Sequence, residues 1–302
     1  MFSLSDENRT MTLTDIPMRN AVSMLYVMRQ ELSGVYSMTE LESLIQRTFK
    51  ELLNMDRMAL MLRPETPVDE QVLERFAEVI DRLKKEEPIQ YIFGYTDFYG
   101  IHLDVKPGVL IPRPETEELV HWMLAEEQHR TGKTIRVLDI GTGSGCIATA
   151  LAKKWNHAEV WATDVSDVAL DLARKNARSN NMKIQFVKAS ILNGEPEHAG
   201  MFDIIVSNPP YVTRNQMPEM KRNVLDFEPH LALFAEGKDP LLFYRAIARY
   251  CQKHLKPDGS LYLEINEDLP ADTTDLLGSF NFTETSVRKD LNGRYRMVKA
   301  AW

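Results

Sequence analysis

The stretch Val137-Leu-Asp-Ile-Gly-Thr-Gly-Ser-Gly145 decides the fold of this chain. In it an apolar strand runs directly into three glycines at alternate positions, and a helical pattern follows. Glycine permits tight turns and a close approach of the backbone to a ligand, and the start of a helix offers free N–H donors. The spacing Gly-x-Gly-x-Gly differs from the Gly-x-Gly-x-x-Gly of dinucleotide-binding folds. The segment therefore predicts a loop that holds a nucleoside cofactor at the end of a strand.

Two carboxylates accompany this loop. Asp164 ends the next predicted strand, 19 residues after Gly145, and a carboxylate there can accept hydrogen bonds from both ribose hydroxyls of an adenosine. The alternative for Asp164 is a structural position as the N-cap of the following helix. Asp139, inside the first strand, could receive the ammonium group of a cofactor or could instead bond the loop backbone.

Strand and helix patterns alternate from Ile135 to the C-terminus. Predicted strands cover 137–140, 160–164, 184–188, 204–206 and 261–265, and predicted helices begin after Gly145, at Ser166 and near Leu241. This alternation implies a mainly parallel sheet covered by helices on both faces, with ligands at the carboxyl ends of its strands. The last two strands, 283–288 and 295–300, have no room between them for a crossover helix, so an antiparallel hairpin is expected at one edge.

The first part of the chain has a different pattern. From about residue 18 to 85 the apolar residues recur at helical spacing, which predicts a small helical bundle. Thr39 with Glu42 fits a capping box, Gly34 a helix stop, and Asp69 the N-cap of the last helix. No cluster of titratable residues stands out here, so we expect a structural cap or a partner-binding domain rather than a catalytic one.

After the helical region the pattern of residue types changes. Aromatic and β-branched residues, broken by Gly94 and Gly100, predict a β-hairpin that links two domains. The expected organisation is a helical bundle at 1–87 that recognises the substrate protein, a hairpin linker at 88–114 and a cofactor-binding catalytic domain at 115–302.

Composition and charge limit the function. The net charge of −8, with 11 basic against 16 acidic residues in positions 1–90, argues against a nucleic-acid partner, because such proteins usually show a basic footprint. Cys146 and Cys251 lie far apart and without a histidine cluster, so we expect no metal site and no disulfide framework. With neither a signal peptide nor an apolar run of membrane length, a cytoplasmic protein is expected.

A second motif, Asn208-Pro-Pro-Tyr211, follows the apolar strand pattern at 202–207. Proline donates no ladder hydrogen bond, so the strand must end there, and the carbonyl of Pro209 is left free with a fixed direction. An amide NH2 group between the Asn208 side-chain oxygen and that carbonyl could donate both protons and turn its nitrogen toward an approaching methyl group. Tyr211 could pack on the planar substrate group. Such orientation allows a weak nucleophile to react without a strong base; the alternative is a structural Asn-Pro turn.

With these motifs the chain resembles the release factor glutamine N5-methyltransferases of the HemK/PrmC type. The resemblance extends over nearly the whole chain. Its most specific pieces are Gln90-Tyr-Ile-Phe-Gly94, Val109-Leu-Ile-Pro-Arg-Pro-Glu-Thr-Glu117, the glycine loop, Asn208-Pro-Pro-Tyr-Val212 and Phe227-Glu-Pro-His-Leu-Ala-Leu-Phe234. Asn-Pro-Pro-Tyr also occurs in DNA adenine methyltransferases, so the flanking segments are what narrow the substrate.

The resemblance implies a class I S-adenosylmethionine-dependent methyltransferase, an α/β protein with a Rossmann-like, mostly parallel sheet, an antiparallel edge hairpin and an N-terminal helical bundle. The implied reaction is methylation of the glutamine in the Gly-Gly-Gln loop of class I peptide chain release factors. A monomer is expected, without direct contact with nucleic acid or membrane. The alternatives are a nucleic-acid adenine N6-methyltransferase, a ribosomal-protein glutamine methyltransferase and a non-catalytic cofactor-binding regulator.

The resemblance also assigns residues. It implies cofactor binding by Gly141, Thr142, Gly143, Gly145, Asp164 and Asn208, substrate binding by Asn208, Pro209, Pro210 and Tyr211, and catalysis by Asn208, Pro209 and Tyr211.

One segment, Lys188-Ala-Ser-Ile-Leu192, departs from the family pattern, since it lacks the acidic and aromatic residues that often lie beside the adenine. Ser190 can still hydrogen-bond the adenine amine, and Ile191 can cover its face. Phe93, Arg113 and Glu117 are expected either to form the wall near the methionyl end or to pack the hairpin and helix.

Overall fold

The computed structural model describes residues 16, 18–130, 134–193, 200–235 and 239–302. The chain forms two compact units that divide between Phe93 and Gly94. The division therefore falls inside the segment expected as a linker, 88–114.

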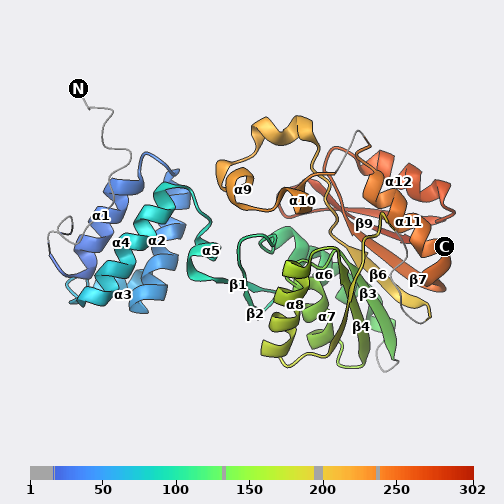
Figure 1. Ribbon diagram of the computed structural model, residues 1–302, viewed down its shortest axis with the longest axis horizontal. Helices are drawn as coiled ribbons and strands as arrows, with labels where there is room; N and C mark the ends of the chain where they lie inside the picture. The colour runs from blue at the N-terminus through green and yellow to red at the C-terminus, as the bar shows by residue number, and fades with distance from the viewer. Residues whose placement is uncertain (1–15, 17, 131–133, 194–199, 236–238) are drawn as a thin grey trace. The chain divides into compact units, whose positions relative to one another are not determined.

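The first unit is a helical bundle, as the apolar spacing predicts (Figure 1). Phe49, Phe76 and Met28 are among the largest buried side chains of its core. Its helices are α1 (Ala21–Leu32), α2 (Met38–Leu53), α3 (Arg57–Leu62), α4 (Glu70–Lys84) and α5 (Ile89–Phe93).

The helix ends of the first unit only partly match the prediction. Asp69 caps α4 as expected by accepting the N–H of Val72. The predicted capping box of Thr39 and Glu42 is wrong, because α2 begins at Met38 and Ser37 and Glu40 form the box instead. Both pairs satisfy the same sequence rule, and the tertiary structure decides where the helix starts.

The aromatic run before the hairpin is helical rather than extended. Arg75 and Arg82 donate hydrogen bonds to the carbonyl of Ile92, near the C-terminal end of α5. Cations and donors at a helix C-terminus satisfy carbonyls that have no partner within the helix. These two arginines lie on α4, so the signal that makes 89–93 helical is not local.

The predicted hairpin is present and begins the second unit. Its strands β1 (Tyr95–Phe98) and β2 (Ile101–Asp104) pair antiparallel in a sheet of their own. The side chain of Asn176 donates to the carbonyl of Asp104 and accepts from its N–H, and Phe98 and Leu103 are buried in the core of the unit. The hairpin is therefore attached to the α/β unit and is not a free linker.

The second unit is built on one seven-stranded sheet in the order β5-β4-β3-β6-β7-β9-β8 (Figure 1). The first five strands of this order are parallel, and β9 runs antiparallel to both of its neighbours, so the predicted edge hairpin is confirmed. The strands are β3 (Ile135–Ile140), β4 (Ala158–Asp164), β5 (Ile184–Lys188), β6 (Phe202–Ser207), β7 (Leu255–Glu264), β8 (Glu284–Lys289) and β9 (Tyr295–Ala301).

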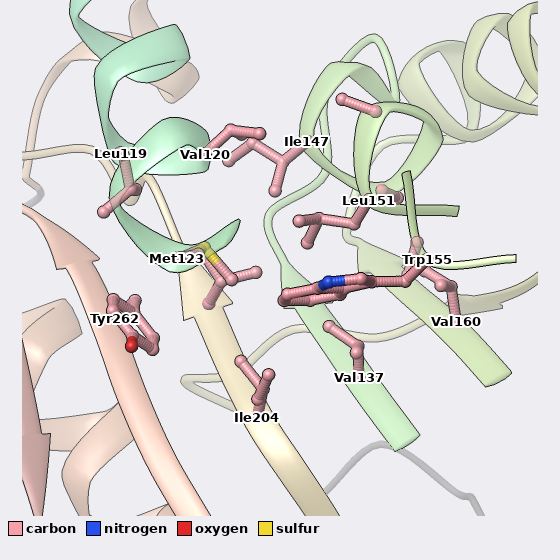
Figure 2. Packing of buried hydrophobic residues seen from close by; sticks show 14 of the residues in the cluster. Leu119, Val120, Met123, Val137, Ile147, Leu151, Trp155, Val160, Ile204 and Tyr262 are labelled. Carbon is pink, nitrogen blue, oxygen red and sulfur yellow. The ribbon is translucent and has the colours of Figure 1, made fainter. Parts of the chain in front are cut away.

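Neighbouring residues of a strand point to opposite faces of the sheet, so both faces are apolar, and helices cover each of them. On one face Val137 packs with α6 (Pro114–Glu126) and α7 (Cys146–Lys154), as Figure 2 shows. On the other face Leu138 belongs to a second core with α11 (Leu242–His254) and α12 (Pro270–Ser279). Helix α8 (Asp167–Ser179) packs beside α7.

In its described residues, the segment between β6 and α11 forms short helical turns, which the sequence patterns do not predict. They are η3 (Arg214–Glu219), α9 (Arg222–Phe227) and α10 (His230–Leu233); a further short turn, η2 (Glu127–Arg130), follows α6. None of the helices in the described part of the chain has the length and apolar character needed to cross a membrane.

Candidate active site

The glycine loop lies where β3 ends and α7 begins. The N–H groups of Gly141 and Thr142 both donate to the carbonyl of Thr163, at 2.9 Å each, which turns the chain across the end of β4. Gly145 has a φ of 79°, and a Cβ atom there would lie 3.0 Å from the Cβ of Ala173 on α8. Backbone conformation and close packing therefore both require glycine at this position.

Asp164 lies at the carboxyl end of β4 and faces this loop. One carboxylate oxygen accepts the N–H of Gly143 and the other accepts the N–H of Ser166, both at 2.9 Å. Because each carboxylate oxygen has a second lone pair, the group can still accept hydrogen bonds from a ligand. Burial raises the pKa of Asp164 above its ordinary range. The N-cap of α8 is Ser166, so the alternative position of Asp164 as that N-cap is wrong.

Asp139 is completely buried beneath the loop and does not line the cavity described below. It accepts a 2.6 Å hydrogen bond from the hydroxyl of Thr142. Of the two alternatives for Asp139, the structure favours the bond to the loop, made through a loop side chain. Burial raises the pKa of Asp139 to about 7.

This pKa has a consequence for stability. The ordinary pKa of an aspartate is 3.8, so between these two values the folded state retains a proton that the unfolded chain has lost. The contribution of Asp139 to stability therefore falls as the pH rises through this window and is constant above it. We expect the free energy of unfolding of the wild type, relative to that of Asp139→Asn, to decline from about pH 4 to about pH 7. Denaturant unfolding of both proteins at several pH values tests this; a difference that stays constant with pH would contradict it.

A cavity of about 380 Å³ opens at the carboxyl ends of β3, β4, β5 and β6. Small-molecule sites are typically about 300–1,000 Å³. The walls are completed by residues 108–113, Thr116, Pro229, Leu231, Ala232, and Phe243 and Ile247 of α11. The cavity brings together the predicted residues Gly141, Thr142, Gly143, Asp164, Ser190, Ile191, Asn208, Pro209 and Pro210.

Besides Asp139, three predicted residues of the second unit lie outside the lining of this cavity. Gly145 lies against Ala173 of α8, Glu117 lies on α6, and Tyr211 is partly buried and packs against the core on the α11 face. A fourth, Phe93, belongs to the first unit. A larger cavity, of about 670 Å³, lies at the opposite ends of β4 and β5, away from the positions where open α/β sheets bind ligands.

Two hydrogen bonds in series hold the side-chain amide of Asn208 in place. Its Nδ2 donates to Thr116 Oγ1 at 3.1 Å, and Thr116 donates to Glu264 Oε2 at 2.6 Å. Asn208 Oδ1 has no hydrogen-bond partner among the described residues. The amide therefore presents an acceptor at the wall of the cavity.

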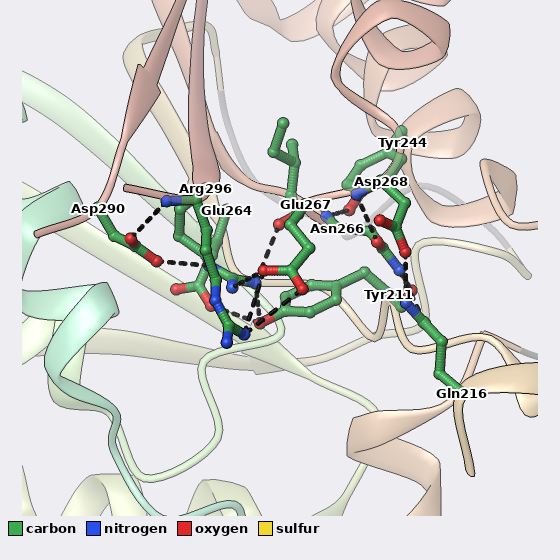
Figure 3. A network of polar contacts seen from close by, with 11 residues as sticks. Tyr211, Gln216, Tyr244, Glu264, Asn266, Glu267, Asp268, Asp290 and Arg296 are labelled. Atoms are coloured by element: carbon green, nitrogen blue, oxygen red, sulfur yellow. Dashed lines mark hydrogen bonds and ion pairs between the residues drawn. The ribbon is translucent and has the colours of Figure 1, made fainter. Parts of the chain in front are cut away.

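The hydroxyl of Tyr211 donates to the other oxygen of Glu264, at 2.8 Å, as Figure 3 shows. Burial raises the pKa of Tyr211 well above its ordinary value, so the phenol keeps its proton. Tyr211 does not line the cavity, and the packing of its ring on the substrate stays a prediction. The ring anchors the end of the Asn-Pro-Pro-Tyr segment to β7.

An ion pair joins two of the motifs that line the cavity. Arg113 pairs with Glu228, and Glu228 also accepts the N–H of Ile111 at 3.2 Å. The side chain of Glu228 is almost completely buried. Arg113 thus lines the cavity, as one alternative has it, and also fixes the 228–232 wall. The sequence gives both motifs but not their pairing.

The most informative residue that the sequence analysis missed is Glu264. An acidic residue at the carboxyl end of a predicted parallel strand, as Asp164 also is, was the signal available. Thr116 lies inside one of the quoted motifs, but nothing local distinguishes it.

Comparisons with known proteins agree with this architecture. A family model described as PrmC N-terminal domain matches residues 28–94, and one described as Methyltransferase small domain matches residues 118–227. The release factor glutamine methyltransferase of Flavobacterium psychrophilum is 45% identical over 271 residues, which cover 89% of this chain and 95% of the relative. That of Bacteroides thetaiotaomicron is 40% identical over 272 residues, covering 90% and 96%. Among solved structures, the human METTL16 catalytic domain, bound to a hairpin of the MAT2A 3'UTR, shares the fold, with a TM-score of 0.53, 19% identity and coverage of 77% and 82%.

Proposed function

The chain belongs to the release factor glutamine methyltransferase family, and on that premise we propose how its residues carry out the reaction. It is an S-adenosylmethionine-dependent enzyme that methylates the side-chain amide nitrogen of a release factor glutamine. We propose that this glutamine is the one in the Gly-Gly-Gln loop of class I release factors.

The cavity fits the cofactor. The glycine loop offers backbone at close range, Asp164 retains lone pairs for the ribose hydroxyls, and Ser190 and Ile191 form the wall at the end of β5. When bound, S-adenosylmethionine supplies an electrophilic methyl group on a sulfonium. We assign the ribose to Asp164 and the adenine to Ser190 and Ile191.

The substrate amide is oriented by acceptors of this chain. We assign one of its N–H groups to Asn208 Oδ1 and the other to the carbonyl of Pro209, which turns the nitrogen toward the methyl group. The bound cofactor would supply its methyl group to this nitrogen, which Asn208 and Pro209 would hold facing it. The proton released from the nitrogen would pass to water. The observation that carries this proposal is the hydrogen bond from Asn208 Nδ2 to Thr116, because it leaves the side-chain oxygen available at the cavity wall. Tyr211 acts by anchoring this segment rather than by touching the substrate.

The proposal is tested with labelled cofactor and three classes of acceptor. We expect label in a class I release factor with its loop glutamine intact, and none when this glutamine is replaced. Ribosomal proteins and plasmid DNA run in parallel address the two alternative substrates. Label in either of these, with none in the intact release factor, would overturn the assignment.

Asp164→Ala is expected to weaken cofactor binding by about 1.5–3 kcal/mol, the range for hydrogen bonds to charged groups. The matched control is Asp167→Ala, three residues along the chain, whose ion pair with Lys188 is exposed. Calorimetry on both folded variants measures the difference. Equal cofactor affinity in the two variants would show that Asp164 does not bind the ribose.

We also propose that the enzyme acts in the cytoplasm, where translation terminates, and as a single copy. Its net charge of −8 disfavours a direct nucleic-acid substrate. We assign recognition of the release factor body to the helical first unit.

A further inference from the structure

A chain of hydrogen bonds behind the Asn208 amide ends at a buried carboxylate. Glu264, the last residue of β7, is 1% exposed. It accepts from Thr116 at 2.6 Å on one oxygen and from Tyr211 at 2.8 Å on the other. Thr116 in turn contacts Asn208, so the carboxylate lies one side chain behind the amide.

Arg296 lies at the end of this series of hydrogen bonds that is farthest from Asn208, and it determines the direction of each bond. Arg296 Nη1 lies 3.5 Å from the Tyr211 hydroxyl, and a guanidinium can only donate (Figure 3). The Tyr211 oxygen therefore accepts from Arg296, and its own proton goes to Glu264. The ion pair with the buried Asp290 holds Arg296 in place, and the partly exposed Glu267 pairs with it as well.

The same reasoning applies on the other side of Glu264. Its second oxygen is also an acceptor, so the single proton of Thr116 is committed to it. The Thr116 oxygen can then only accept, and the part of the Asn208 amide that faces it must be the NH2 group. With the amide turned over, two acceptors would face each other at Thr116, and an NH2 group would face the donors of the substrate amide.

We propose that Glu264 is a positioning residue which, through Thr116, fixes the Asn208 side-chain amide with its oxygen toward the substrate nitrogen. This inference rests on the proposed function and adds a residue that touches neither substrate nor cofactor. The side-chain amide has nearly the same shape when its oxygen and NH2 group are exchanged, and the role of Glu264 is to exclude that second orientation.

Glu264→Gln tests the direction of the bonds. In this variant the glutamine oxygen must accept the hydrogen bond from Tyr211, so the glutamine NH2 group faces Thr116. The Thr116 proton then turns toward Asn208, and the Asn208 amide turns over. We expect a fall in the single-turnover rate of about tenfold to a hundredfold, with nearly unchanged cofactor affinity. The matched control is Glu267→Gln, which removes the same charge beside Arg296 but does not contact Thr116; its rate should stay within about twofold of the wild type.

A compensating change separates this role from a structural one. Aspartate at position 208 offers an oxygen on both sides, so it can accept from Thr116 and still present an acceptor to the substrate. The double variant Asn208→Asp with Glu264→Gln should therefore react about tenfold faster than Glu264→Gln alone. Asn208→Asp alone should be slow, because the Thr116 proton is already committed to Glu264. A double variant no faster than Glu264→Gln, or Glu264→Gln within twofold of the wild type, overturns the proposal.

Two further measurements keep the test independent of folding and of the substrate. Thr116→Ser retains the hydroxyl and should lose far less rate than Thr116→Val. In ¹⁵N spectra, the side-chain NH2 signals that disappear in Asn208→Asp identify Asn208. They should move in Glu264→Gln and Thr116→Val but not in Glu267→Gln, and unmoved signals count against the proposal even if no acceptor protein is methylated. A wild type that does not methylate the release factor overturns the proposed function instead, which is a separate result.

Discussion

Asn208→Ala is expected to lower the single-turnover rate of methyl transfer by about 10²-fold or more, the effect of removing one preorganised polar group from a reaction centre. The variant loses the acceptor that orients the reacting nitrogen. It also leaves Thr116 without its donor, although Thr116 keeps its bond to Glu264. Because Asn208 lies after the end of β6, in a segment anchored independently through Tyr211, the fold should be retained.

Single-turnover rates, thermal unfolding and cofactor affinity together measure this effect. The matched control is Asn292→Ala, an exposed asparagine in the β8–β9 turn, which should react at the wild-type rate. A loss confined to the rate, with little change in affinity, indicates an interaction made mainly in the transition state. A rate within about threefold of the wild type would exclude the orientation mechanism.

Removal of residues 1–93 is expected to leave cofactor binding nearly intact and to abolish methylation of the full-length release factor. The division between Phe93 and Gly94 marks where to cut, because each unit encloses its own core. All residues lining the cavity lie in the second unit. If the bundle binds the body of the release factor, its binding energy is available to position the glutamine, as remote contacts are in other enzymes.

The rival idea is that the bundle only shields apolar surface of the catalytic unit. It predicts aggregation or lost cofactor binding of the 94–302 fragment, whereas our assignment predicts a soluble fragment that binds the cofactor. A short glutamine-containing peptide should be a poor substrate for both forms, because its contact area is too small to offset the entropy of association. A soluble fragment that methylates the full-length factor at the normal kcat/KM would contradict our assignment.

The sequence alone predicted the architecture of the second unit because its signals are local. A glycine such as Gly145, at positive φ and against the next helix, admits almost no other residue. The central strands β3 and β6 are buried almost along their whole length, so they read as short apolar runs between helical patterns. The position of Asp164 beside the cofactor loop was predicted in the same way, because it ends a predicted strand.

Short elements were less predictable. Helix α5 depends on arginines of α4, and the helical turns between Asn208 and α11 have fewer than eight residues each. Local propensity over so few residues is outweighed by tertiary contacts.

What the sequence by itself determined is therefore the cofactor loop, its acidic partner, the sheet and the position of the Asn-Pro-Pro-Tyr motif. Only the tertiary structure decided which buried polar groups pair behind that motif. Asn208 meets Thr116 across 92 positions of sequence, Thr116 meets Glu264 across 148, and Tyr211 meets Glu264 across 53. Each of these groups must find a partner once it is buried, since an unpaired polar group is costly. The sequence shows that requirement, but the partner that meets it is set by which strand and helix ends the fold brings together.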